Sequence, residues 1–321
     1  MIALLVSPAT ACGGSHGTDP ERAPARPVVA TAADESSPAG GRGWIAWTRG
    51  STPGPVIVLA LGRVLVRRTG SRATEEVGPP GVVGASGGGD ARTLAIQQVR
   101  RGRSDLKLYD LGTRALRDPP RGVNTRQWEW RGEIYGRWLL FGRVDFGLGL
   151  YRVVLHDLAT GDERVIAAVS GHGAYAEPGQ LNGRIAVWAA CPDNACTIYR
   201  LRIGDRVPVR VAAKLYGRAD YAASVTRRGV VYYAEGGLGC GRQVRIMVAA
   251  PGRAPRTLVA LPPGYDLRFT TALDEGRGTR ILYDRVRCST RRSDVYEVDD
   301  PPLARPPAVS PPSIGITAPV R

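Results

Sequence analysis

The feature that most constrains this chain is a unit of about 45–50 residues that recurs six times. In each unit an apolar run of β-branched and aromatic residues precedes a variable loop, and a second such run follows the loop. Equivalent points in the six units are Ala46, Ala95, Leu140, Ala186, Val231 and Leu282, which are separated by 49, 45, 46, 45 and 51 residues. A period of this length is typical of repeat architectures in which each unit packs against its neighbours.

The clearest unit, residues 136–168, contains three short runs of strand-forming residues. They are WLLF at 138–141, YRVVLH at 151–156 and RVI at 164–166, and turns rich in Gly and Asp separate them. Such runs are typical of strands linked by hairpins. No long stretch of the chain has apolar residues at the helical period, so we expect few or no helices. Several strands per unit at this period predict an all-β fold, a six-bladed β-propeller of four-stranded antiparallel blades.

The order of strands and turns resembles the WD40-like repeats of TolB-type six-bladed propellers. The best matches are NGRIA at 182–186 and YDLGT at 109–113, and the resemblance covers about residues 43–300. The Ser-Pro-Asp-Gly turn that is usual in this family is missing from every unit. The resemblance therefore implies the architecture, and the role of TolB does not follow from it.

The first twelve residues, MIALLVSPATAC, resemble the signal of a bacterial lipoprotein. An apolar run is followed by small residues and then by Cys12. The resemblance implies that Cys12 is lipidated, that the lipid is the only contact with the membrane, and that the protein is extracytoplasmic. Two departures are the lack of Lys or Arg before the apolar run and Ala9 in place of the usual Leu. An ordinary secretory signal on a secreted protein, or a plain N-terminus, is the alternative.

The rest of the chain falls into three segments that differ in amino-acid composition. Residues 13–42 are rich in Gly, Ser, Pro and Ala without a periodic apolar pattern, which predicts a disordered tether. Residues 43–300 hold the six units of the propeller. The tail, 301–321, is rich in Pro, and 313–317 is a candidate strand that would close the ring of the first or the sixth unit.

Four cysteines remain if Cys12 is lipidated. Cys191 and Cys196 flank the loop between two strands of the fourth unit, and Cys240 and Cys288 lie in equivalent loops of the fifth and sixth units. We predict the disulfides Cys191–Cys196 and Cys240–Cys288, which also indicate an oxidising compartment. A metal site is not expected, because the chain has three histidines and no CxxC pair.

The net charge is +15, and only Lys107 and Lys214 among the 44 basic residues are lysine, which leaves 42 arginines. A basic chain can bind nucleic acid or another anionic polymer. The arginines are scattered, and Arg, Ala, Gly and Pro are all abundant, as a GC-rich genome would produce. We therefore do not expect a nucleic-acid partner. The expected partner is a protein or an anionic envelope polymer, and the expected state is a monomer.

Motifs for catalysis are weak in this sequence. Residues 84–88, GASGG, match the spacing of a nucleophile elbow, but a strand and not a helix follows them. No cofactor motif occurs, and no catalytic residue is assigned. The sequence favours a binding or scaffold protein over an enzyme, and an extracytoplasmic hydrolase or lyase with a site at the channel mouth is the alternative.

The segments that precede the innermost strands of a propeller cross one face near its channel. In this chain they combine aromatic, acidic and basic residues, which predicts a binding face there. The candidate residues are Trp128, Glu129, Tyr175, Glu177, Asp220, Tyr221, Asp266 and Arg268. The loops that hold Cys191 and Cys288 are expected on the opposite face. The sequence names no ligand, partner or pathway.

Overall fold

A computed structural model describes residues 24–53, 60–78, 84–100, 102–193, 195–216, 223–236, 243–274 and 278–301. Every regular element in these ranges is a β-strand. Accordingly, no helix within the described ranges is long and apolar enough to cross a membrane. The predicted all-β fold is confirmed.

The described strands form six groups of four, each antiparallel within the group. The first three groups are joined into one twelve-stranded sheet, and the other three are separate sheets. The first group is β2 (Glu35–Gly41), β3 (Trp44–Pro53), β4 (Ala60–Arg68) and β5 (Thr74–Glu76). The second is β6 (Gly84–Gly89), β7 (Thr93–Arg100), β8 (Arg103–Asp110) and β9 (Leu116–Arg117). The third is β10 (Trp128–Tyr135), β11 (Trp138–Asp145), β12 (Leu150–Asp157) and β13 (Glu163–Ser170).

The remaining groups follow the same order. The fourth is β14 (Tyr175–Asn182), β15 (Ile185–Cys191), β16 (Ala195–Arg202) and β17 (Val209–Tyr216). The fifth is β18 (Ser224–Val225), β19 (Val231–Glu235), β20 (Arg245–Ala249) and β21 (Arg256–Ala260). The sixth is β22 (Tyr265–Asp274), β23 (Thr279–Arg287), β24 (Ser293–Asp300) and, from the N-terminal end of the chain, β1 (Arg26–Val29).

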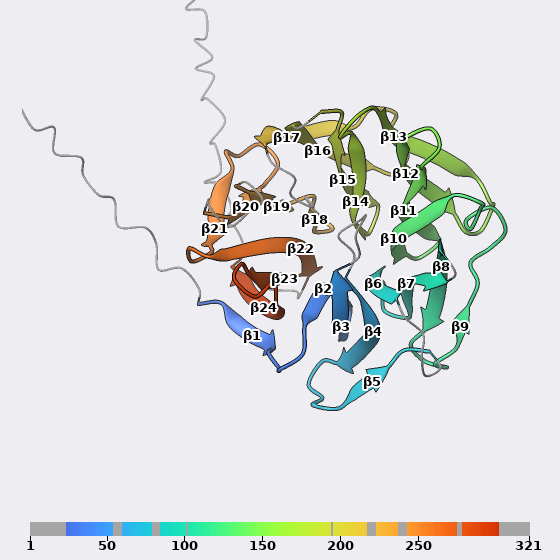
Figure 1. Cartoon of the computed structure of the whole chain (residues 1–321). Helices are drawn as coiled ribbons and strands as arrows, with labels where there is room; N and C mark the ends of the chain where they lie inside the picture. The colour runs from blue at the N-terminus through green and yellow to red at the C-terminus, as the bar shows by residue number, and fades with distance from the viewer. Residues whose placement is uncertain are drawn as a thin grey trace, which may run out of the picture.

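The groups are the blades of a propeller. The strands β2, β6, β10, β14, β18 and β22 surround a common centre, and later strands of each blade lie farther out (Figure 1). The six equivalent points of the sequence repeat all lie in the second strand of a blade, and all six side chains are buried. The repeat therefore identified a buried strand in each blade.

The ring is closed by the N-terminal strand β1, which pairs antiparallel with β24. Arg26 lies opposite Glu297 and also contacts Asp299 at 2.8 Å, and Val29 lies opposite Val295 and is buried. The proposed closing strand at 313–317 lies outside the described residues. Because β1 occupies the outer edge of the sixth blade, the closing role belongs to the N-terminal side of the chain.

The expected tether at 13–42 is wrong for residues 24–42, which include β1 and the innermost strand β2. The sequence of β2 is ESSPAGG, which has the composition of a linker. Close packing near the axis requires such small residues. A Cβ atom on Gly41 would lie 2.4 Å from the carbonyl oxygen of Asp90 in the next blade. Innermost strands can therefore lack the apolar pattern by which strands are found in a sequence.

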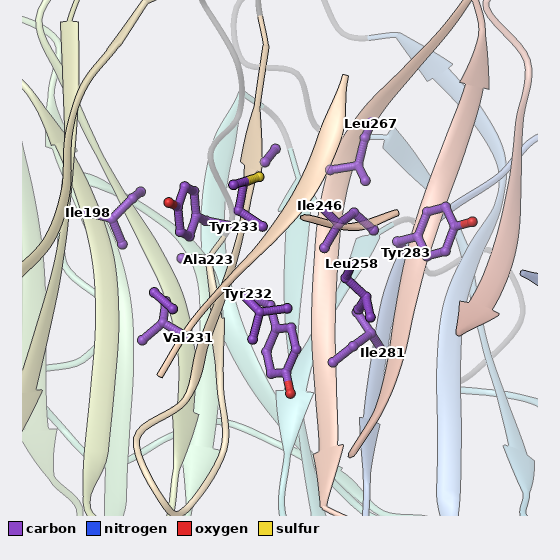
Figure 2. Close-up of a cluster of buried hydrophobic side chains, with 14 of the residues drawn as sticks. Ile198, Ala223, Val231, Tyr232, Tyr233, Ile246, Leu258, Leu267, Ile281 and Tyr283 are labelled. Carbon is purple, nitrogen blue, oxygen red and sulfur yellow. The ribbon is translucent and has the colours of Figure 1, made fainter. Parts of the chain in front are cut away.

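The core lies between neighbouring blades, and strand β15 shows how it is built. Val187 and Ala189 pack toward one neighbouring blade, whereas Ala186 and Trp188 pack toward the other. Alternate residues of a strand point to opposite sides, so a strand between two blades is apolar on both. Figure 2 shows one such cluster, which includes Ile198 from the fourth blade and Ile281 from the sixth.

The two faces of the propeller follow from the direction of the strands. The first residue of an innermost strand lies opposite the last residues of the second strand: Trp128 pairs with Val144, Tyr175 with Cys191, and Tyr265 with Arg287. We call this side the loop face. The other side, where the innermost strands end at Gly41, Asn182 and Asp274, is called the hairpin face.

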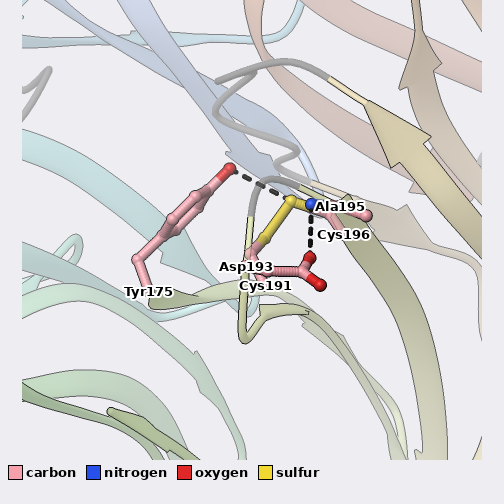
Figure 3. Close-up of a disulfide and its surroundings, with 5 residues drawn as sticks. All are labelled: Tyr175, Cys191, Asp193, Ala195 and Cys196. Carbon is pink, nitrogen blue, oxygen red and sulfur yellow. Dashed lines mark hydrogen bonds between the residues drawn. A yellow bond between two sulfur atoms is a disulfide. The ribbon is translucent and has the colours of Figure 1, made fainter. Parts of the chain in front are cut away.

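The cysteine loops lie on the loop face, so their predicted position on the opposite face is wrong. The reason is that the second strand of an antiparallel blade returns to the side on which the first strand began. The bridge Cys191–Cys196 is present in the turn between β15 and β16, and the Tyr175 hydroxyl lies 3.3 Å from Cys196 Sγ (Figure 3). Cys288 is disulfide-bonded too. Cys12 and Cys240 lie outside the described residues, so the lipidation and the pairing Cys240–Cys288 stay predictions.

Candidate binding face

The structure places the predicted face residues at two depths. Trp128 and Tyr175 are partly buried at the loop face, whereas the other four described residues are buried beneath it. Those four are Glu129, Glu177, Asp266 and Arg268. Asp220 and Tyr221 lie outside the described residues. The buried four therefore support the face from below, and a partner that docks on the surface would not touch them.

Glu129 is bound from two sides. One carboxylate oxygen, Oε1, accepts hydrogen bonds from the Thr125 hydroxyl at 2.6 Å and from Arg143 Nε at 3.1 Å. Arg143 in turn donates to both carboxylate oxygens of Glu163, at 2.7 and 3.0 Å. Burial raises the pKa of Glu129. These contacts join the loop before β10 to β11 and β13, so Glu129 has a structural role.

Glu177 forms a buried ion pair inside the ring. Its Oε1 lies 3.3 Å from the guanidinium of Arg131, and its Oε2 accepts a hydrogen bond from the Trp130 indole at 3.3 Å. The guanidinium of Arg131 also lies over the ring of Phe269, 4.6 Å from its centroid. Burial raises the pKa of Glu177. The pair links the third, fourth and sixth blades near the axis, where a polar group needs a partner.

Glu133 is buried on β10, two residues after Arg131. Backbone N–H groups of Gly88 and Leu181 donate hydrogen bonds to its carboxyl group, and burial raises its pKa to about 8. A Cβ atom on Gly88 would lie 1.6 Å from Glu133 Oε2, so any other residue there would displace this carboxyl group. Glu133 thus joins the second, third and fourth blades from the inside.

An exposed apolar group on the loop face was missed by the sequence analysis. Phe146 is 45% exposed and Leu148 is 69% exposed in the turn between β11 and β12. The ring of Phe146 packs edge to face on Trp128, with 5.3 Å between the ring centroids. We call Trp128, Phe146 and Leu148 the apolar knob.

The turn that carries the knob is held by hydrogen bonds. Asp145 Oδ1 accepts the backbone N–H of Leu148 at 3.2 Å, and Asp145 Oδ2 accepts the side-chain amide of Gln127 at 2.9 Å. Gly149 has a φ of 57°, a conformation that glycine adopts without strain. The Trp128 indole donates to the carbonyl of Gly102 in the second blade at 3.0 Å. The exposed side chains are therefore presented by a fixed backbone.

Comparison with known proteins gives matches of structure alone. No protein-family model matches the chain, and no curated protein matches it by sequence. Among solved structures, TolB from Acinetobacter baumannii matches with a TM-score of 0.52 and 16% identity, over 80% of this chain and 64% of that one. Putative TolB from Agrobacterium tumefaciens matches with a TM-score of 0.52 and 12% identity, over 85% and 92% of the two chains. The fold is a TolB-like β-propeller.

A sialidase also shares this fold. The Trypanosoma rangeli sialidase in complex with the inhibitor DANA matches with a TM-score of 0.53 and 9% identity, over 86% of this chain and 57% of that one. The propeller of this chain is thus similar to two TolB structures and to a sialidase at identities that establish only the fold. The chain also spans a little under two thirds of the Acinetobacter TolB. Function must be argued from the chain's own residues.

The interior of the TolB-like propeller offers little for catalysis within the described residues. Glu129, Glu133 and Glu177 are each buried and bound to a basic side chain or to backbone N–H groups. Within those same ranges, no three His, Cys, Asp or Glu side chains lie together in a way that could hold a metal ion. Residues 84–88, which match the nucleophile-elbow spacing, belong to the innermost strand β6.

The disulfide indicates the kind of cellular compartment in which the protein folds. Disulfides form and persist in oxidising environments and are rare in the cytosol. Cys191–Cys196 is buried beside Tyr175 and closes the turn between two strands of the fourth blade. The bridge indicates an extracytoplasmic location.

Proposed function

We propose that this protein is an extracytoplasmic binding protein that docks a partner protein on its loop face. The observation that carries the proposal is the apolar knob, in which Phe146 and Leu148 are exposed on a turn fixed by Asp145. Aromatic and large apolar side chains at the centre of a contact dominate the affinity of protein interfaces. A turn that is already ordered loses little conformational entropy on binding.

The shape and chemistry of the knob favour a protein over a polymer as its occupant. The knob projects from a turn, so it fits an apolar pocket on another protein. An anionic polymer would gain less from Phe146 and Leu148, because it has little apolar surface to bury against them. The other exposed large apolar side chains among the described residues are Val165, Val207 and Val209, which lie in or beside the outermost strands of the third and fourth blades.

A lipid anchor at Cys12 would suit this arrangement. β1 begins at Arg26 beside Asp299, near the end of β24, and Asp300 pairs with Thr279 at the hairpin face. The chain therefore enters the propeller from the hairpin face. An anchor on that side would hold the hairpin face toward the membrane and leave the loop face accessible to a partner.

Site-specific photo-cross-linking in the native cell envelope tests the proposal. A photoreactive residue in place of Leu148 should give one dominant adduct, and mass spectrometry should identify its other half as a protein. The matched control is the same residue in place of Val207, which is 75% exposed but lies away from the loop-face turn, and it should give no such adduct. Identical adducts from both positions, or none from position 148, would contradict docking at the knob.

A further inference from the structure

A cavity of about 740 Å³ opens at the centre of the hairpin face. All six blades contribute to it, through the ends of their innermost strands or the turns that follow them. This volume falls in the range of small-molecule sites. The cavity lies on the opposite side of the ring from the apolar knob and shares no residue with it.

Three arginines line this cavity: Arg42, Arg92 and Arg227. They come from the turns after the innermost strands of the first, second and fifth blades, and all three side chains are exposed. None of the three guanidinium groups forms an ion pair with a described residue. Arg227 lies over the ring of Tyr135, 5.4 Å from its centroid. The cavity therefore has three guanidinium groups available to an anion.

The two aspartates of the cavity are already engaged. Asp90 accepts the backbone N–H of Arg92 at 2.8 Å through Oδ1 and that of Gly136 at 2.9 Å through Oδ2. Asp274 Oδ2 accepts the side-chain amide of Asn182 at 3.1 Å and the backbone N–H of Arg227 at 2.9 Å. These carboxylates join blades and orient the arginine turns. They leave the guanidinium groups unpaired, although their charge still lies in the cavity.

The charges that line the cavity favour one class of anionic ligand over another. Three arginines and two aspartates leave a small positive excess, which disfavours a dense polyanion such as polyphosphate beside the carboxylates. A carboxylate carries one charge and matches the planar fork of a guanidinium with two parallel hydrogen bonds. Hydroxyl groups of a ligand could donate to the remaining lone pairs of Asp90 and Asp274.

We propose that the hairpin-face cavity binds an acidic saccharide, with its carboxylate groups on Arg92, Arg227 and Arg42. The ligand is either a free sugar acid or the end of an acidic polysaccharide, since both present the same carboxylate and hydroxyl groups. This site is independent of protein docking on the loop face. Its failure would leave the proposal for the knob unaffected.

Calorimetric titration of the full chain with trigalacturonate tests this site. Binding should weaken steeply as ionic strength rises from about 0.01 to 0.15 M, because the Debye length falls from about 30 to about 8 Å. Arg92→Gln combined with Arg227→Gln should weaken binding about tenfold or more, since two charge-assisted contacts are lost. Monogalacturonate distinguishes the sources: equal affinity assigns the site to a free sugar acid, and weaker affinity assigns it to a chain end.

The matched control is Arg228→Gln, because Arg228 is exposed, adjoins Arg227 and does not line the cavity. This variant should bind trigalacturonate like the wild type, and all variants should keep the wild-type melting temperature. Neutral maltotriose should not bind. The proposal fails if maltotriose binds as well as trigalacturonate, if tripolyphosphate binds more tightly, or if Arg228→Gln weakens binding as much as the double variant.

Discussion

On the loop face the third blade presents Phe146 and Leu148, whereas on the hairpin face the blades present Arg42, Arg92 and Arg227 around a cavity. The same six blades build both faces. The two faces differ in which turns between strands form their surface. Phe146 and Leu148 of the knob lie in a turn between a second and a third strand, away from the axis, where bulky side chains have room.

The turns of the hairpin face come directly from the innermost strands, which converge near the axis. Gly41 and Gly89 permit this approach, because a Cβ atom on either would lie within 2.5 Å of a backbone oxygen. Small residues leave a hollow, and Arg42, Arg92 and Arg227 line it from the turns. The knob is therefore a projecting apolar group, whereas the cavity is a hollow whose lining includes three arginines and two aspartates. The buried ion pair and carboxyl groups that lie between the two faces should stabilise both faces equally.

The largest expected effect comes from breaking the ion pair between Arg131 and Glu177, which lies between the two faces. Arg131→Met should lower the free energy of unfolding by about 3–5 kcal/mol, because it leaves Glu177 buried without its cation. Urea denaturation measures the change. The exposed pair Arg63–Glu76 is the control, and Arg63→Met should cost less than about 1 kcal/mol. Similar losses in both variants would mean that Arg131 is not a central support.

The pH dependence of stability tests Glu133. Burial raises the pKa of its carboxyl group to about 8, so the folded protein holds this proton more tightly than the unfolded chain. Its contribution to stability is full below about pH 4.5 and is lost as the pH rises to about 8. Relative to the wild type, Glu133→Gln should therefore become more stable across this range. Denaturation curves at pH 5, 6, 7 and 8 measure the difference, and a difference that does not change with pH would contradict the buried, protonated carboxyl.

Truncating the knob should remove docking without affecting the fold. Phe146→Ala combined with Leu148→Ala should cost more than about 2 kcal/mol of binding to the protein captured from position 148, as is usual at interface hot spots. The control, Val207→Ala with Val209→Ala, should change binding by less than about 0.5 kcal/mol. Surface plasmon resonance with the purified partner measures both. Wild-type affinity in the knob variant would place docking elsewhere.

Loosening the turn should have a smaller effect than truncating it. Asp145→Ala removes the acceptor for the Leu148 N–H and the Gln127 amide, while Phe146 and Leu148 stay in place. Docking should weaken by about 1 kcal/mol, because the turn must then be ordered on binding. Trigalacturonate binding should not change. An equal loss at both faces would show that Asp145 acts through the stability of the whole propeller.

The period of the sequence predicted the second and third strands of the blades, because they are apolar on both sides and lie between neighbouring blades. It did not reveal β1 or β2, since a short edge strand and a Gly-rich innermost strand lack that pattern. Strand direction decides which loops share a face, and the loops that hold Cys191 and Cys288 share the loop face because the second strand returns to the side where the first strand began. The pairing Cys191–Cys196 could be predicted because a hairpin turn brings its own ends together.

The candidate site was predicted less well than the fold. Glu129 and Glu177 stand beside aromatic residues in the sequence, which is typical of an exposed site, but their partners Arg143 and Arg131 come from other strands. Such contacts cannot be read from the order of residues. The knob has a signal in the sequence, because DFGLGL at 145–150 places two large apolar residues in a glycine turn. The arginine cavity left none, since its residues are scattered along the chain.

The central claim is that the two faces hold separate sites of opposite chemistry, and one paired titration tests it most directly. The captured partner protein and trigalacturonate are each titrated against two variants, Phe146→Ala with Leu148→Ala and Arg92→Gln with Arg227→Gln. The account predicts that the knob variant loses the protein and keeps the saccharide, and that the arginine variant does the reverse. Loss of both ligands in either variant, or loss of the protein in the arginine variant, would contradict it.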